Sequence, residues 1–450
     1  MPKNNQPARE KNIDAIVSFF ESGIETHAKR LGIELEHTLL HADGRAVSYS
    51  EPHGTAWLLE RLRDAGYAEE TRDAEGDLLG VAMRGGAGAP GTPGAEAPSV
   101  AFAQAVTIEP AAQVELSAGP FVELTDAARC FEDFEAQLDR ALSPTDVRVL
   151  TLGYHPTSRA ADLELIPKRR YELMNRYLGG ISPFGVCMMR GSASTQVSID
   201  YTSVEDCLRK LRLAFALVPL LALLCDNAPA FEGAPRTHEL VRTAIWKYCD
   251  PDRCGVVPGA MQPGFTLRDY AEYVLDAPAI LAPDAQAEEG WREDARTFGE
   301  IYAEQPMQRA DVEHALSMFF TDVRLKTYIE IRPADAMPVP YVIAYAALIK
   351  GLFYGEGSLD ALDALFAGAS EADVAAAKES LMARGYEGEA YGSPVGEVMD
   401  DVMGIARAGL CENDRKWLAP LEKLAQARTT LARRVESGGH ATSTPKHGEQ

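Results

Sequence analysis

Apolar residues recur at helical spacing in several parts of the chain. Near the N-terminus they repeat every three or four positions, at Ile13, Ile16, Val17, Phe20 and Ile24, and this predicts an amphipathic helix. Residues 57–65 predict a second helix, with Gly66 suited to its C-terminal cap. Further helical patterns cover 126–142, 203–225, 359–367, 371–384 and 411–434.

Four short segments alternate between apolar and polar residues as strands do, and their polar faces carry groups that bind metals and anions. The segments are 32–37, 109–117, 195–200 and 324–332. Alternate side chains of a strand point to the same face. The residues sharing a polar face are therefore Glu34 and Glu36; Gln113, Glu115 and Ser117; Gln196, Ser198 and Asp200; and Lys326, Tyr328, Glu330 and Arg332. His37 points to the opposite face.

A single such segment is typical of a solvated strand face, but the four together suggest a site. Glu and Lys are not favoured in strands, and two like charges repel by up to about 4 kcal/mol at ~4 Å with an effective dielectric near 20. The five carboxylates would converge only around cations; they are Glu34, Glu36, Glu109, Glu115 and Glu330. Oxygen ligands suit Mg²⁺ or Mn²⁺. Arg332 and Lys326 would then meet phosphate oxygens.

Composition excludes several classes of protein. The 450 residues contain 44 Lys and Arg against 67 Asp and Glu, and the net charge of −23 argues against a nucleic-acid partner. The longest apolar run, 213–225, has 13 residues, short of the roughly 20 of a membrane helix. The N-terminus lacks the apolar region of a signal peptide. Seven cysteines without a CxxC pair indicate reduced thiols in the cytoplasm.

Residues 86–91 match GxGxxG but do not predict a dinucleotide loop. No helical pattern follows, and three prolines within nine residues would prevent a helix. We interpret 84–98 as a flexible surface loop. Residues 435–450 are rich in Gly, Ser, Thr, His and Pro, and their composition predicts a disordered tail.

Several segments together resemble plant-type and proteobacterial glutamate–cysteine ligases. They are GIELEH (32–37), IEPAAQVELS (108–117), IPKRRYELMNRYL (166–178), CMMRGSASTQVSIDY (187–201), RTAIWKYCDPDRCG (242–255), YAEYVLDAP (270–278) and DVRLKTYIEIRPAD (322–335). The resemblance covers residues 30 to 355 in order. Ala111-Ala112, Ser198 and Pro333 depart from the residues common in that family.

The resemblance implies an α+β fold with a curved, largely antiparallel sheet like that of glutamine synthetase and helices on its outer face. We expect a catalytic domain over 1–360, a C-terminal helical region over 361–434 packed on it, and a tail over 435–450. The implied reaction is ATP-dependent joining of glutamate to cysteine through a γ-glutamyl phosphate, the first step of glutathione synthesis. The alternatives are a ligase for a different amine and a catalytically inactive metal- or nucleotide-binding regulator.

The resemblance also implies residue roles. Glu34, Glu36, Glu109, Glu115 and Glu330 would bind Mg²⁺ or Mn²⁺; Arg332 and Lys326 would be catalytic; Gln113, Ser117, Gln196, Lys326 and Arg332 would contact ATP; and Arg242, Trp246, Tyr171 and Arg190 would bind amino-acid substrate. The expected partners are L-glutamate, L-cysteine and ATP, with no nucleic acid and no membrane. A monomer or a homodimer is expected.

Overall fold

The computed structural model describes residues 6–25, 29–73, 75–84, 102–284, 286–287 and 290–437. The loop predicted over 84–98 lies outside the described residues except for Arg84, and so does the predicted tail from residue 438 onward. Its first residues, Val435 and Glu436, belong to a short helix, α16 (Leu431–Glu436).

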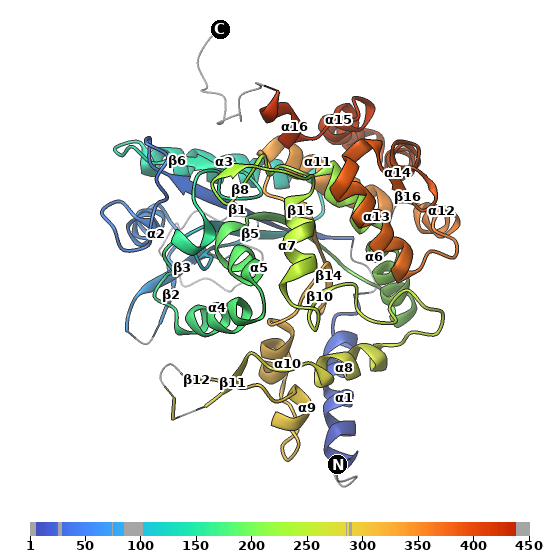
Figure 1. Ribbon diagram of the computed structural model, residues 1–450, viewed down its shortest axis with the longest axis horizontal. Helices are drawn as coiled ribbons and strands as arrows, with labels where there is room; N and C mark the ends of the chain where they lie inside the picture. The colour runs from blue at the N-terminus through green and yellow to red at the C-terminus, as the bar shows by residue number, and fades with distance from the viewer. Residues whose placement is uncertain are drawn as a thin grey trace, which may run out of the picture.

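An antiparallel sheet forms the centre of the molecule (Figure 1). Its strands lie in the order β14-β15-β7-β1-β5-β4-β3-β2, and β6 pairs with the far end of β1. Their bounds are β1 (Leu31–Leu40), β2 (Glu69–Arg72), β3 (Leu78–Met83), β4 (Ala103–Ile108), β5 (Val114–Phe121), β6 (Arg148–Leu150), β7 (Ser194–Ile199), β14 (Val323–Leu325) and β15 (Ile329–Asp335). The predicted α+β class with a largely antiparallel sheet is confirmed.

Three long helices cover one face of this sheet: α3 (Leu124–Leu142) packs on β5, α6 (Val204–Leu224) on β14 and β15, and α11 (Val339–Tyr354) on β1 and β7. The apolar run 213–225 lies almost entirely in α6, whose residues from Leu213 to Leu224 are all buried. Among the described residues, no helix combines the length and apolarity needed to span a membrane. The run is therefore part of the protein core.

The C-terminal helices form a second layer outside α6 and α11 (Figure 1). They are α12 (Ser358–Leu365), α13 (Glu371–Arg384), α14 (Val395–Gly409) and α15 (Glu412–Gln426). The single helix predicted over 411–434 is interrupted, because Arg428 has a positive φ of 48° and Thr430 caps the new helix α16. Residues 411–434 are therefore two helices.

Most of the remaining elements lie on the other side and at the lower end of the sheet (Figure 1). The exceptions are α2 (Thr55–Asp64), which packs on β3 beside α3, and the strand pair at 389–394, which packs on α13 and α14. The helices are α1 (Gln6–Glu21), α2 (Thr55–Asp64), α4 (Arg169–Ile181), α5 (Pro183–Val186), α7 (Val241–Cys249), α8 (Leu267–Asp276), α9 (Phe298–Ile301) and α10 (Arg309–Leu316). Short two-stranded pairs are β8 (Ala230–Phe231) with β9 (Ala234–Pro235), β10 (Cys254–Gly255) with β13 (Phe320–Thr321), β11 (Leu281–Pro283) with β12 (Trp291–Glu293), and β16 (Glu389–Ala390) with β17 (Ser393–Pro394).

Two of the four alternating segments are not single strands. In 109–117 the chain turns between β4 and β5, where Ala112 has a positive φ of 68° and its N–H donates to the Glu109 carbonyl. In 324–332 a tight turn at 326–328 separates β14 from β15, so this segment is a hairpin. Glu109, Lys326 and Tyr328 therefore approach the sheet from turns.

Candidate functional site

The register of four neighbouring strands brings the predicted polar face together. Glu36 on β1 lies opposite Glu115 on β5, and Glu34 lies opposite Ser117 on β5 and Gln196 on β7. The intervening residues of β1 point the other way, into the core. The strand alternation read from the sequence is therefore correct for β1, β5 and β7.

This face forms part of a cavity of about 340 Å³. All the predicted site residues except Ser117 and Arg190 line it: Glu34, Glu36, Glu109, Gln113, Glu115, Tyr171, Gln196, Arg242, Trp246, Lys326, Glu330 and Arg332. Ser117 lines an adjoining cavity of about 660 Å³, which shares Glu34. The two cavities therefore meet at β1.

Four of the carboxylates are crowded without enough positive charge around them. Burial raises the pKa of Glu34, of Glu36 and of Glu109, the last to about 7. Burial, reinforced by the other three carboxylates, raises the pKa of Glu115 well above its usual range. Each shift means that the ionised form is disfavoured unless a cation joins the site.

Hydroxyl groups hold two of these carboxylates in place. Ser194 donates to both oxygens of Glu36, with its hydroxyl at 2.6 Å and its backbone N–H at 3.0 Å. The hydroxyls of Ser117 and Thr107 donate to one oxygen of Glu115, at 3.0 and 3.2 Å. Glu36 and Glu115 are therefore pre-oriented while keeping lone pairs for a ligand.

Glu330 has a different environment from the other carboxylates. Arg324 donates to both of its oxygens, at 2.6 and 3.0 Å, Arg332 lies at 3.1 Å, and the Lys326 ammonium lies at 3.4 Å. These three cations outweigh burial and hold the pKa of Glu330 well below its usual range. Arg324 was not among the predicted site residues, although its even position placed it on the face of Lys326 and Glu330.

Arg332 and Arg242 form one wall of the cavity. The Arg332 guanidinium donates to the Gln196 amide oxygen, and its Nε has no hydrogen-bond partner among the described residues. Arg242 stacks on Trp246, with its guanidinium carbon 3.9 Å from the ring centroid, and its Nε donates to the Arg332 carbonyl at 3.1 Å. Both arginines therefore keep donors available for an anion.

Helix α4 supplies the facing wall through Lys168, Arg170, Tyr171 and Met174. Arg170 donates to Nδ1 of His314 at 3.3 Å and to the Ser317 hydroxyl at 2.5 Å, and it forms no ion pair with any described carboxylate. Arg170 was missed in the sequence, where the only signal was its place in the basic run IPKRRY. After Arg332 and Arg242, it is a third arginine that an anion can reach.

Two predicted residues have structural contacts instead. Arg190 lies outside the 340 Å³ cavity, and its guanidinium donates to the Asn175 side chain at 2.9 Å and to the Leu163 carbonyl at 2.8 Å. Gln113 reaches the cavity wall, but its NH₂ donates to the carbonyls of Arg190 and Ser192 at 3.0 and 2.9 Å. Gln113 therefore ties the turn before β5 to the segment before β7.

The carboxylates could supply only part of the coordination shell of a metal ion. In the part of the chain that the structure describes, no group of three or more His, Cys, Asp or Glu side chains is arranged to hold an ion alone. Mg²⁺ keeps several waters and commonly takes other ligands from substrate phosphates. The all-oxygen set and its unrelieved negative charge fit such a metal.

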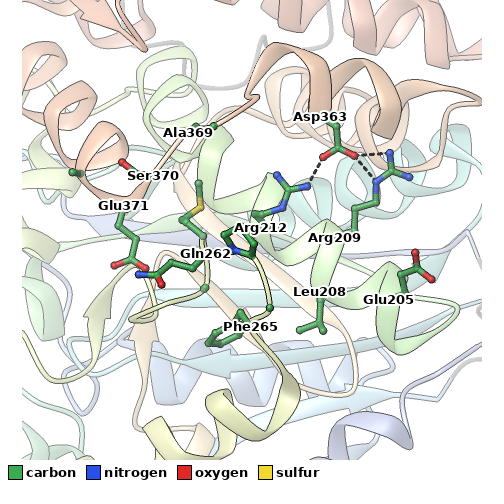
Figure 2. A pocket seen from close by; sticks show the side chains of 16 residues that line it. Glu205, Leu208, Arg209, Arg212, Gln262, Phe265, Asp363, Ala369, Ser370 and Glu371 are labelled. Carbon is green, nitrogen blue, oxygen red and sulfur yellow. Dashed lines mark hydrogen bonds and ion pairs between the residues drawn. The ribbon is translucent and has the colours of Figure 1, made fainter.

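The largest cavity described lies elsewhere, between α6, α12, α13 and the loop before α8, with a volume of about 1000 Å³ (Figure 2). Its two arginines are already paired: Arg209 donates to Asp363 at 2.7 Å, and Arg212 also donates to Asp363. Glu371 accepts the backbone N–H of Gly259 at 2.6 Å. This cavity contains none of the predicted site residues, and its main charged groups are satisfied by the protein.

Comparisons with known proteins agree with the sequence resemblance. The family model described as glutamate–cysteine ligase family 2 matches residues 30–443. The chloroplastic glutamate–cysteine ligase of Arabidopsis thaliana is 29% identical over 321 residues, 68% of this chain and 60% of that protein. The enzyme of Brassica juncea is 30% identical over 317 residues, 68% of this chain and 61% of that protein. The chain thus spans about 60% of these relatives.

A solved structure supports the fold. A crystal structure of the glutamate–cysteine ligase of Francisella tularensis in complex with AMP aligns with a TM-score of 0.53 and 12% identity. The alignment covers 94% of this chain and 86% of that chain. At this identity the likeness shows a shared fold.

Proposed function

Because this chain belongs to glutamate–cysteine ligase family 2, we propose that it joins the γ-carboxylate of L-glutamate to the amine of L-cysteine with hydrolysis of ATP. This is the first step of glutathione synthesis. The observation that supports it best is the cavity at β1, where crowded carboxylates face a cluster of arginine and lysine. ATP needs both, since metal ions neutralise its phosphates and cations meet the remaining charge.

The proposed metal ligands are Glu34, Glu36, Glu109 and Glu115, which would share Mg²⁺ or Mn²⁺ with the phosphates of ATP. When bound, the metal supplies charge neutralisation of the phosphate oxygens. Glu330, the fifth predicted ligand, would reach a metal only by releasing a donor, because each of its oxygens already accepts from two. Arg324 and Arg332 donate to one oxygen, and Arg324 and Lys326 to the other. We propose that Glu330 instead orients Arg324, Lys326 and Arg332.

Different substrates would occupy the two cavities that meet at β1, of about 660 and 340 Å³. The nucleoside of ATP fits the larger one, whose walls include the small residues Gly32, Ala103 and Ala118 and leave room for a planar base. Glutamate fits the smaller one, where its α-carboxylate would meet Arg242 beside Trp246. The γ-phosphate then lies between them at the carboxylates, next to Glu34.

The reaction follows from this placement. The glutamate γ-carboxylate attacks the γ-phosphorus of ATP in line, which forms γ-glutamyl phosphate and releases ADP. Arg332 and Lys326 stabilise the charge that develops on the transferred group. The acceptor amine then attacks the acyl carbon, so that the amide forms and phosphate and a proton leave. No protein nucleophile is needed.

Arg170 supports an amino acid as the acceptor. It enters the cavity from α4, forms no ion pair among the described residues, and has Ser317 and His314 to fix its position. A second α-carboxylate would be its natural partner, because a buried guanidinium favours a bidentate carboxylate. This favours cysteine over an amine that lacks a carboxylate.

We place the enzyme in a reducing cytoplasm, where its seven cysteines stay free, as the structure has them. We propose one catalytic domain over residues 1–360, supported by the helical region 361–434. In favour of this division, α13 packs on α6, and α14 and α15 pack on α11. The helical region thus packs on the helices that cover the outer face of the sheet.

An ADP-release assay with ATP, glutamate and Mg²⁺ tests the function, with cysteine present or omitted. Turnover that depends on cysteine is expected; turnover without cysteine, or none at all, would overturn the proposal. Cysteamine, which lacks the carboxylate, should be a much poorer acceptor than 2-aminobutyrate, which lacks only the thiol. Arg170→Ala should reduce that preference.

Arg332→Ala tests the catalytic role. We expect it to cost about 2–4 kcal/mol in the chemical step, as removal of one oxyanion donor does in other enzymes. The loss should appear in kcat at saturating substrates. A change confined to the KM for glutamate would remove Arg332 from the phosphoryl-transfer step.

A further inference from the structure

A separate cavity of about 470 Å³ lies on the outer side of the sheet, among α3, α11, α15 and α16. These elements lie together in Figure 1, near the C-terminal end of the described chain. Its apolar lining comes from Val149, Leu150, Leu152, Pro338, Val339, Pro340, Pro420, Leu431 and Val435. Its size is typical of small-molecule sites.

One wall carries a carboxylate that the protein does not neutralise. Glu135 of α3 lines the cavity with 14% of its side chain exposed, and its only ionic neighbour among the described residues is His37 Nε2, 3.9 Å away. His37 is completely buried, and its Nδ1 lies 3.1 Å from the Val114 carbonyl. The 3.9 Å between its Nε2 and Glu135 is too long for a hydrogen bond, so His37 does not satisfy this carboxylate.

Ionisation of the Glu135 carboxylate is unfavourable in this environment, and a bound cation would offset that cost. Burial, with Asp139 and Glu132 nearby, raises the pKa of Glu135 to about 7. A carboxylate held against apolar walls without a cation costs free energy. Asp139, one helical turn further along α3, also lines the cavity. This wall therefore favours an ammonium group.

The opposite wall has the opposite sign. Lys423 of α15 and Arg434 of α16 line the cavity, and neither forms an ion pair with a described residue. They lie on different helices from Glu135 and Asp139, and α11, whose first residues line the cavity, packs against both α3 and α15. The cavity thus combines an acidic wall, an apolar floor and a basic wall.

We propose that this cavity binds a small zwitterion with an apolar body, an amino acid or a dipeptide. Its ammonium would face Glu135 and Asp139, and its carboxylate would face Lys423 and Arg434. The charge complementarity of the two walls carries the assignment, since a simple amine would leave the basic wall unpaired and a simple acid would leave Glu135 unpaired.

A ligand here would touch the segment that follows the catalytic strand β15. Pro338 to Tyr341 form part of the lining, and so does Asn227, which donates to Asp335 at 2.7 Å and to the Ala336 carbonyl at 2.8 Å. Arg332 lies three residues before Asp335. Occupancy should therefore change the rate of the reaction; this part rests on the proposed function, whereas binding itself does not.

The test uses the full chain and L-leucyl-L-leucine, titrated by calorimetry with ATP analogue and glutamate saturating the other cavities. Binding is expected, and Glu135→Gln should weaken it by about tenfold or more through loss of one charge-assisted contact. N-acetylation or amidation of the dipeptide should each weaken it similarly. Asp133→Asn, an exposed change on the same helix outside the cavity, should leave binding within about twofold.

Loss of binding, or of its dependence on the charged groups, would overturn the assignment, whereas the response of ADP release tests only the coupling. Absence of binding at millimolar dipeptide would contradict the proposed site. So would equal binding to wild type and to Glu135→Gln, provided that urea unfolding shows the variant to be folded as wild type is. Equal binding of the acetylated dipeptide would remove the role of the acidic wall. If binding held but ADP release did not respond, the cavity would be a binding site without coupling to β15.

Discussion

Glu330 and Glu115 lie on the same face of the sheet but should respond in opposite ways to the same substitution. Glu330 is completely buried and accepts from Arg324 at 2.6 and 3.0 Å and from Arg332 at 3.1 Å. A glutamine keeps the shape but removes the negative charge, and its NH₂ group meets another donor. Glu330→Gln therefore leaves three cations facing one another.

Removing one partner of a buried ion pair typically costs about 3–5 kcal/mol. That is a large share of the roughly 5–15 kcal/mol by which native proteins are stable. We expect Glu330→Gln to lower the free energy of unfolding by this amount, which appears as a lower urea midpoint at an unchanged m-value. ADP release should also be nearly abolished, since Lys326 and Arg332 lose the group that orients them.

Glu115→Gln is the matched control. Glu115 has no cation beside it, and burial together with Glu34, Glu109 and Glu36 raises its pKa well above the usual range. Removing its charge relieves repulsion, so with EDTA present this variant should be as stable as wild type or more stable. Its activity should still be lost, because a proposed metal ligand is gone.

The comparison of the two variants is decisive. If Glu115→Gln lost as much stability as Glu330→Gln in EDTA, the distinction between a neutralised and an uncompensated carboxylate would be wrong. If Mg²⁺ and an ATP analogue stabilised the wild type and Glu115→Gln equally, Glu115 would not be a metal ligand. A ligand that binds only the folded state should raise its stability with the logarithm of the ratio of ligand concentration to Kd.

Two further predictions concern stability. Gly153→Ala would place its Cβ 2.1 Å from the carboxyl carbon of Asp335, which is 3% exposed; we expect a loss of at least about 1–3 kcal/mol in urea unfolding, and wild-type stability would contradict the packing. Burial lowers the pKa of His41, but hydrogen bonds to Asp146 and Glu51 outweigh it, so the pKa is raised. His41 thus contributes stability below its unfolded pKa of about 6.5, and this is lost as pH rises through the higher folded value. His41→Ala should flatten that part of the pH–stability profile, and an unchanged slope would refute the pairing.

The sequence predicted the central face because the alternation of side chains along a strand is a local property that does not depend on the tertiary structure. Period two was enough to orient Glu34 and Glu36, and the cavity then required only that β5 and β7 pair with β1. Glu109 was predicted correctly as part of the cavity but through the wrong element, since it reaches the site from a turn. The turn needs a positive φ at Ala112, which alanine rarely adopts, so the sequence did not predict it.

Residue type alone did not predict which polar groups are already used by the protein. Arg190 and Gln113 looked like ligand-binding residues, yet backbone carbonyls far along the chain take their donors. Arg324 and Arg170 line the cavity but were missed. The alternating pattern did place Arg324 on the face of Glu330, but its pairing with Glu330 depends on the hairpin. Arg170 reaches the cavity because its helix packs across it, and no local pattern contains that packing.

The net charge of −23 describes the whole chain, but charges of both signs are concentrated on separate sides of the cavity. On one side of the cavity, Arg324, Lys326 and Arg332 share the single negative charge of Glu330. On the other side, burial and then neighbouring carboxylates raise the pKa of Glu115 and of Glu109. A triphosphate could meet the first half directly but would be repelled by the second. Only an added cation makes both halves attractive to it, which is why the proposed enzyme should need a divalent metal even though its arginines have donors for an anion.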